Sequence, residues 1–131
     1  MRVGDVMAVT ARQVYDLALV HIDEVMDSGK IAPRQPKYYE ARAKSLITVL
    51  QTELLPQGTE PVIITDLNQE ISLPDRVALL VLPYGLAAHL LMVDDMEIAS
   101  FLNARYEELK NKLPSKIMPI EDVYYTLGGM L

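Results

Sequence analysis

The sequence contains two histidines, and each lies near carboxylates that could form a metal site or an acid–base pair. The first group is His21, Asp23 and Glu24. On a helix, residues two apart do not face each other, so His21 and Asp23 would not share a ligand. The position one helical turn further on is Val25, which offers no ligand. We therefore interpret His21 as a partly buried helix residue.

The second group, His89 with Asp94 and Asp95, is better suited to metal binding or general-base chemistry. Asp94, however, forms a capping box with Glu97, which predicts that Asp94 begins a helix. Asp95 and Glu97 would then supply the acidic first turn that the helix dipole favours. We predict no catalytic, metal-binding or cofactor-binding residue. A metal-dependent enzyme built on His89 and the acidic pair stays open as an alternative.

Other catalytic motifs are missing from the sequence. There is no cysteine, which excludes disulfides, thiolate metal sites and thiol nucleophiles. With two histidines, no Ser–His–Asp arrangement can be assembled with assurance. The sequence has no phosphate-binding P-loop, and its glycine pair, Gly128 and Gly129, does not lie between a strand and a helix. We expect a protein without enzymatic activity.

Size and composition fit one globular domain over residues 1–131. Apolar residues make up 50% and charged residues 23% of the chain, which is typical of a folded protein and not of a disordered one. The net charge of −6 argues against a dedicated nucleic-acid binder, which normally has a basic surface. Residues 1–52 hold seven basic and six acidic side chains, whereas residues 53–131 hold five and twelve. A head-to-tail contact between copies could use this asymmetry, although two solvated faces explain it more simply.

Apolar residues recur at helical spacing along most of the chain. A capping box of Thr10 and Gln13 predicts a helix over about 10–28. Pro36 suits the first turn of a second helix, over 36–55, since that position needs no N–H. The connection between these helices is short, so we expect them to be antiparallel.

A capping signature of Ser72 and Asp75 predicts a third helix over 73–93. Pro83 lies in its interior, where it removes a hydrogen bond and clashes with the preceding turn, so the helix should be kinked or divided there. The acidic capping box described above begins a fourth helix, over 95–112.

Residues 77–93 (VALLVLPYGLAAHLLMV) are apolar on every side. The run is shorter than the roughly 20 residues that a bilayer requires, and no basic cluster flanks it. We therefore expect a buried helix, surrounded by other helices or by partner subunits, and no membrane association. The N-terminal sequence MRVGDVMAVTAR has no uninterrupted apolar segment, so we expect no signal peptide.

Two segments depart from the helical pattern. Residues 61–73 contain the β-branched run VIIT, the turn-forming DLNQ and then EISL. A short β-hairpin around 61–73 and an irregular loop both fit this segment. The C-terminal sequence IEDVYYTLGGML suggests a short strand or an extended arm. The predicted fold is thus mostly α, a bundle of four to five helices with these two additions.

Tyrosines are the best candidates for interface residues, because they anchor protein–protein contacts well. We select Tyr84, Tyr106, Tyr124 and Tyr125. Each could equally lie at the edge of the core with its hydroxyl in water. Tyr84 is the most specific of the four, since it lies at the proline kink with Gly85 behind it, a residue that eases close packing.

Several of these residues form a recurring pattern. Residues 82–84 read LPY, 94–95 are an acidic pair, 99–101 read ASF and 106–109 read YEEL. This half of the chain resembles small phage and prophage proteins encoded among the head and head–tail joining genes of Gram-positive bacteria. The segments YDLALVHIDEVMDSGKI and YYEARAKSLITVLQTEL are similar to the opening helices of those proteins.

The resemblance implies a virion component, a head–tail connector or adaptor that works as a ring of identical subunits and contacts other phage structural proteins. It implies no active site, no cofactor and no specific nucleic-acid binding. An acidic chain around a DNA channel would let DNA slide. The alternative is a small prophage-encoded regulatory module that binds a host protein. We expect the protein in the virion in the first case, and in the host cytoplasm in the second.

Overall fold

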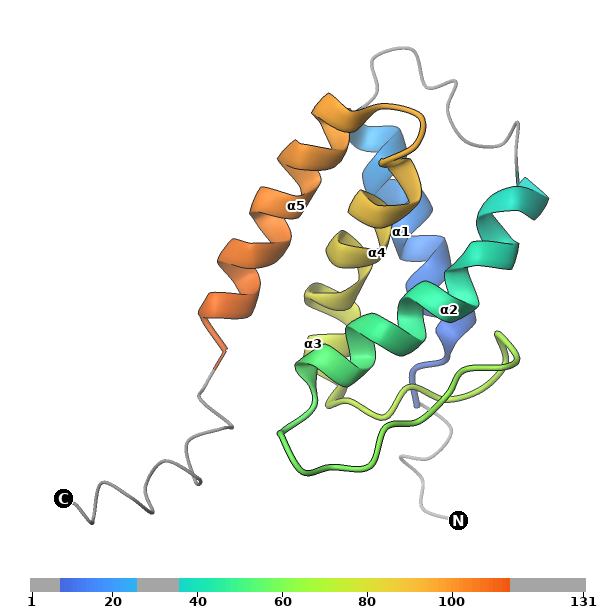
Figure 1. The fold of residues 1–131 in the computed structure, drawn as a ribbon, viewed down its shortest axis with the longest axis vertical. Helices are drawn as coiled ribbons and strands as arrows, with labels where there is room; N and C mark the ends of the chain where they lie inside the picture. The colour runs from blue at the N-terminus through green and yellow to red at the C-terminus, as the bar shows by residue number, and fades with distance from the viewer. Residues whose placement is uncertain (1–7, 26–35, 114–131) are drawn as a thin grey trace, which may run out of the picture.

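The apolar periodicity of the sequence produces helices in the computed structural model, which describes residues 8–25 and 36–113. Five helices occur in these ranges: α1 (Ala11–Val25), α2 (Pro36–Leu54), α3 (Asp75–Leu80), α4 (Leu82–Leu91) and α5 (Met96–Asn111). Figure 1 shows α1 and α4 running in one direction and α2 and α5 in the other. The described ranges contain no strand, so the mostly helical fold class is confirmed for them. The predicted end of the first helix at residue 28 and the C-terminal arm lie outside these ranges.

The first helix begins with the predicted capping box. The Thr10 N–H donates to Gln13 Oε1 at 2.9 Å, and the Gln13 N–H donates to Thr10 Oγ1 at 3.3 Å. Each side chain thus satisfies a backbone N–H that the helix itself cannot pair.

The apolar run of residues 77–93 is divided into two helices and is not one kinked helix. α3 ends at Leu80 and α4 begins at Leu82, with Val81 between them at φ −106° and ψ −51°. This division places Pro83 in the first turn of α4. Its missing N–H costs nothing there, because the first N–H groups of a helix have no intrahelical partner.

The predicted capping signature of Ser72 and Asp75 is wrong. The N-cap of α3 is Pro74, which makes no side-chain capping bond. The Ser72 N–H instead donates to Gln51 Oε1 at 2.6 Å, which ties this backbone to α2. The backbone before α3 is therefore held by a distant helix, a contact that the local sequence pattern cannot reveal.

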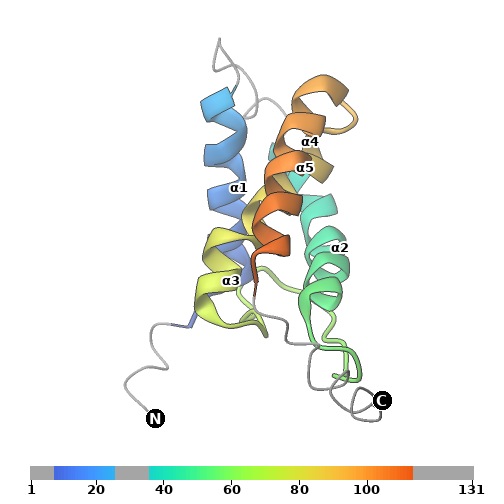
Figure 2. The same ribbon diagram turned by 90° about the vertical axis from the view of Figure 1, so that its left-hand side faces the viewer.

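α4 is the centre of the bundle, packed against α1, α2, α3 and α5 (Figure 2). Its buried residues are Leu82, Pro83, Gly85, Leu86, Ala87, Ala88, Leu90 and Leu91. Burying a leucine side chain contributes about 1.5–3 kcal/mol, so this helix supplies much of the driving force for folding. The middle of the apolar run is therefore intramolecular core. Among the described helices, none is long and apolar enough to cross a membrane.

Residues 61–73 form an irregular loop, and the alternative of a β-hairpin is not supported. Within the described part of the chain, their only bridge of sheet type is an isolated antiparallel pair, Thr10 with Glu70. The loop bonds both within itself and to α2: Gln69 Nε2 donates to the Ile63 carbonyl at 2.8 Å, and the Ile64 N–H donates to Thr48 Oγ1 of α2 at 2.9 Å. Gln51 Nε2 of α2 donates to the Val62 carbonyl at 3.2 Å. These partners replace the ladder that a hairpin would require.

The same loop completes the start of α1. The Ala11 N–H donates to the Gln69 carbonyl at 2.9 Å, and the Arg12 N–H donates to the Leu67 carbonyl at 2.8 Å. First-turn N–H groups lack partners within their own helix, so the loop links the beginning of α1 to the second half of α2.

Candidate functional site

The turn between α4 and α5 is built by the acidic pair. The N–H groups of Asp94 and Asp95 donate to the Leu91 carbonyl at 2.9 and 2.8 Å. The N-cap of α5 is Asp95, whose carboxylate accepts from the Ile98 N–H at 3.0 Å. The prediction that Asp94 is the cap is therefore wrong by one residue. Asp94 instead accepts a hydrogen bond from the Tyr39 hydroxyl of α2.

Large apolar side chains are exposed around this turn, which we call the α4–α5 corner (residues 92–96). The exposed fractions are 42% for Met92, 63% for Val93 and 62% for Met96. Phe101, in the second turn of α5, is 62% exposed. Single exposed apolar residues are normal, whereas several close together mark an interaction site. The α4–α5 corner is the described part of the molecule that best fits a protein–protein contact.

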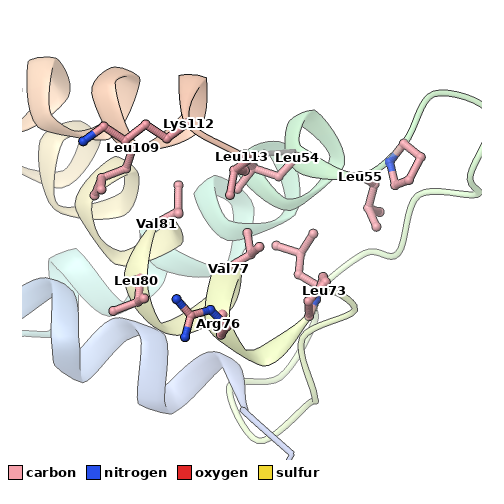
Figure 3. A pocket seen from close by; sticks show the side chains of 12 residues that line it. Leu54, Leu55, Leu73, Arg76, Val77, Leu80, Val81, Leu109, Lys112 and Leu113 are labelled. Atoms are coloured by element: carbon pink, nitrogen blue, oxygen red, sulfur yellow. The ribbon is translucent and has the colours of Figure 1, made fainter. Parts of the chain in front are cut away.

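A second apolar feature lies at the opposite ends of the helices, between the last turn of α2, α3 and the last turn of α5 (Figure 3). We call it the apolar groove, with a volume of about 650 Å³. Eight leucine and valine residues line it: Leu54, Leu55, Leu73, Val77, Leu80, Val81, Leu109 and Leu113. Its charged lining residues, Arg76 and Lys112, are both basic. No pattern in the sequence predicts this groove, because three separate segments form it.

Tyr84 lies where α1, α4 and α5 meet. Its ring stacks on the His21 ring, with 3.9 Å between centroids and 10° between planes. The Arg105 guanidinium carbon lies 5.7 Å from the centre of the same ring, within the range of a cation–π contact. The structure thus places Tyr84 in a partly buried stack of three side chains.

His21 is partly buried, in agreement with its interpretation as a helix residue. Its Nδ1 lies 3.8 Å from a Glu24 oxygen, too far for a hydrogen bond, and this atom has no hydrogen-bond partner among the described residues. Burial lowers the pKa of the imidazole, and the nearby Glu24 carboxylate only partly opposes the shift. The ring is thus biased towards its neutral form, in which it stacks on Tyr84.

Tyr106 is an interior residue, with 1% of its surface exposed. Its ring packs against Gly85, where the Cβ of any larger residue would lie 2.8 Å from Tyr106 Cε1. The predicted role of Gly85 in close packing is therefore confirmed. Burial and the neighbouring Glu53 carboxylate raise the pKa of the Tyr106 phenol.

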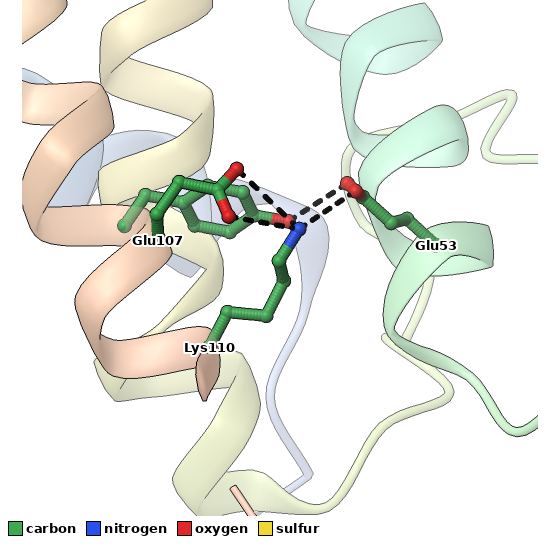
Figure 4. A network of polar contacts seen from close by, with 4 residues as sticks. Glu53, Glu107 and Lys110 are labelled. Atoms are coloured by element: carbon green, nitrogen blue, oxygen red, sulfur yellow. Dashed lines mark hydrogen bonds and ion pairs between the residues drawn. The ribbon is translucent and has the colours of Figure 1, made fainter. Parts of the chain in front are cut away.

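A polar network joins α2 to α5 beside this ring (Figure 4). The Tyr106 hydroxyl donates to Glu53 Oε1 at 2.9 Å, and Lys110 Nζ donates to Glu53 Oε2 at 2.9 Å. Lys110 also pairs with Glu107 at 3.3 Å. Burial alone would raise the pKa of Glu53, but the hydrogen bonds from Lys110 and Tyr106 outweigh burial and lower it. The network gives the hydroxyl of a buried tyrosine a hydrogen-bond partner. Its two carboxylates, Glu53 and Glu107, both pair with Lys110, so the network is structural and does not resemble an acid–base site.

The residues considered for metal binding, His89, Asp94 and Asp95, make structural contacts instead. His89 Nδ1 lies 2.8 Å from the Gly85 carbonyl, while Asp94 and Asp95 have the partners described above. Among residues 8–25 and 36–113, no three histidine or acidic side chains are close enough together to hold a metal ion. The geometry therefore supplies nothing in favour of the metal-enzyme alternative.

Of the four tyrosines selected from the sequence, Tyr84 is half-buried, Tyr106 is buried, and Tyr124 and Tyr125 lie outside the described residues. The exposed methionines of the α4–α5 corner were not among the selected residues. For Met92, the signal in the sequence was the continuation of the apolar run beyond the end of α4, whereas Met96 lies beyond that run. Comparison of the chain with protein-family models, curated proteins and solved structures found no match.

Proposed function

We propose that this chain is a non-enzymatic structural protein of a phage or prophage, a head–tail joining subunit that associates with copies of itself and with other virion proteins. The observation that carries the proposal is the exposure of Met92, Val93 and Met96 at the α4–α5 corner. Exposed apolar side chains that lie close together lower their free energy by meeting a partner.

Three further features support the proposal. The acidic pair and the ASF sequence, on which the resemblance to phage joining proteins depends, belong to the same turn and the start of the same helix. Methionine side chains are flexible and polarizable, so they can fit partners of different shape. A subunit that contacts both its own copies and other virion proteins would use this property. A net charge of −6 suits a ring through which DNA slides.

Self-association is tested by light scattering over a wide range of protein concentrations. We expect the wild-type mass to rise with concentration, and Met96→Glu to weaken association at least about tenfold because a charge would enter an apolar contact. Val49→Glu is the matched control, since Val49 is 63% exposed on α2 and Met96 is 62% exposed on α5. A wild-type protein that stays monomeric, or equal effects of both variants, would contradict this role of the α4–α5 corner.

The virion role is tested separately by affinity capture from cells that produce the phage. Recovery of phage structural proteins by the wild type, and their loss with Met96→Glu, is the expected result. Recovery of a host factor without any phage structural protein would overturn the proposal in favour of the regulatory module. Portal and capsid genes on one side and tail genes on the other would give independent support.

A further inference from the structure

We propose that the apolar groove between α2, α3 and α5 is the docking site for residues 117–125 of the same chain, IMPIEDVYY. The inference does not depend on the virion role, since it concerns a contact within one molecule. Three properties of the groove lead to it: exposed apolar walls, basic charge in the lining, and the position of Leu113.

The walls of the groove leave apolar surface exposed. Leu80 is 52% exposed, and Val77 and Leu109 are only partly buried. A volume of about 650 Å³ falls within the range of pockets that enclose a ligand of several apolar groups. Residues 117–125 supply such groups at Ile117, Met118, Ile120, Val123, Tyr124 and Tyr125.

The charges of the groove and of this segment are complementary. Arg76 and Lys112 are the charged residues that line the groove. Lys112 pairs with Glu108 at 3.7 Å, whereas Arg76 has no ion pair with a carboxylate among the described residues. Glu121 and Asp122 lie in the middle of the segment, with Ile120 and Val123 on either side. An occupant with one acidic site between apolar side chains matches this surface.

The position of Leu113 favours a segment of the same chain over a second copy. Leu113 is itself a lining residue, so the proposed segment begins only four positions beyond a wall of the groove. Four residues reach up to about 14 Å, and a tether this short gives an effective concentration in the millimolar range. Binding within the chain should therefore outcompete binding between copies at ordinary protein concentrations.

Disulfide cross-linking in the full-length chain tests the proposal, because the protein has no native cysteine. The test variant carries Leu80→Cys and Ile120→Cys, and the control carries Val49→Cys and Ile120→Cys. Leu80 and Val49 are both exposed, at 52% and 63%, so neither change should disturb the core. We expect the test pair to form an intramolecular disulfide at least about tenfold faster than the control, read from the mass and mobility of the monomer.

Two results would overturn the proposal. A disulfide-linked dimer whose yield rises with concentration would assign the groove to a second copy, and equal rates for the two pairs would show that the segment does not dock there. Charge reversal adds a specific check: Arg76→Glu should slow cross-linking about twofold to fivefold, as expected for one exposed ion pair, and Glu121→Lys in the same chain should restore the rate. Absence of this rescue would contradict the proposed contact with the acidic pair.

Discussion

At the scale of single residues, the contact between Gly85 and Tyr106 sets the distance between α4 and α5. The glycine lies inside an apolar helix, where alanine would be the better helix former by about 1 kcal/mol. Glycine is required because the buried ring of Tyr106 occupies the space of a side chain. The ring has little freedom to withdraw, since its hydroxyl is hydrogen-bonded to Glu53.

We expect Gly85→Ala to lower the free energy of unfolding by about 1–3 kcal/mol, as for other overpacked cores. The added Cβ would lie 2.8 and 2.9 Å from two ring carbons of Tyr106, closer than atoms in a packed core approach. Urea unfolding measures the change, and in a Tyr106→Leu background the cost of the same substitution should shrink. A gain in stability would show that the ring moves aside.

At the scale of the elements, one buried side chain of α2 organises the loop that follows it. Gln51 is fully buried, and its amide bonds to two points of the loop, the Val62 carbonyl and the Ser72 N–H. These contacts hold the loop against α2 near both of its ends. They also give backbone groups of residues 61–73 the hydrogen-bond partners that a hairpin would otherwise supply.

Gln51→Leu should lower the free energy of unfolding by about 1–3 kcal/mol, because it leaves a backbone donor and acceptor without their partners. Gln57→Leu, at an exposed glutamine of the same connection, is the control and should stay within about 0.5 kcal/mol of the wild type. Hydrogen exchange gives a local measurement. The Ser72 amide should exchange faster in Gln51→Leu than in the wild type, and at the wild-type rate in Gln57→Leu. Unchanged exchange there would contradict the role assigned to Gln51.

At the scale of the whole molecule, α4 is the axis around which the other helices pack, and the network at Glu53 joins α2 to α5 across the bundle. The folded-state pKa of Glu53 is lowered, so its carboxylate stabilises the fold above the ordinary glutamate pKa. That contribution disappears as the pH falls through the lowered value. Lys110 stays charged across this range, since its pKa is raised: burial would lower it, but the contacts with Glu53 and Glu107 outweigh burial.

Glu53→Gln should therefore reduce stability at neutral pH and have little effect in acid. The side chain of Glu53 is 45% exposed, so we expect a cost on the order of 1 kcal/mol at pH 7. The difference should shrink as the pH falls below the ordinary glutamate pKa of about 4.3 and vanish only below the lowered pKa of Glu53. Urea midpoints at several pH values measure it, with the exposed Glu60→Gln as control. A difference that persists unchanged at low pH would indicate a packing effect.

Much of the secondary structure follows from the sequence alone. The helical spacing of apolar residues, the capping box at Thr10 and the proline at position 36 predict where four segments are helical. These signals are local, acting over three or four residues, so they can be recognised without knowledge of the fold. The predicted close packing at Gly85 is of the same kind, since a glycine inside an apolar helix indicates a neighbour at short range.

Tertiary structure alone decided the rest. Contacts between residues distant in the sequence, such as Tyr39 with Asp94 and Gln51 with Ser72, decided three features. These are the aspartate that caps α5, the lack of strand pairing within residues 61–73, and the position of Pro83 in its helix. The apolar run of residues 77–93 shows the same limit. Its composition indicates burial but cannot say by what, and only the packing of α4 shows that its middle is core while Leu79, Leu80, Met92 and Val93 stay exposed.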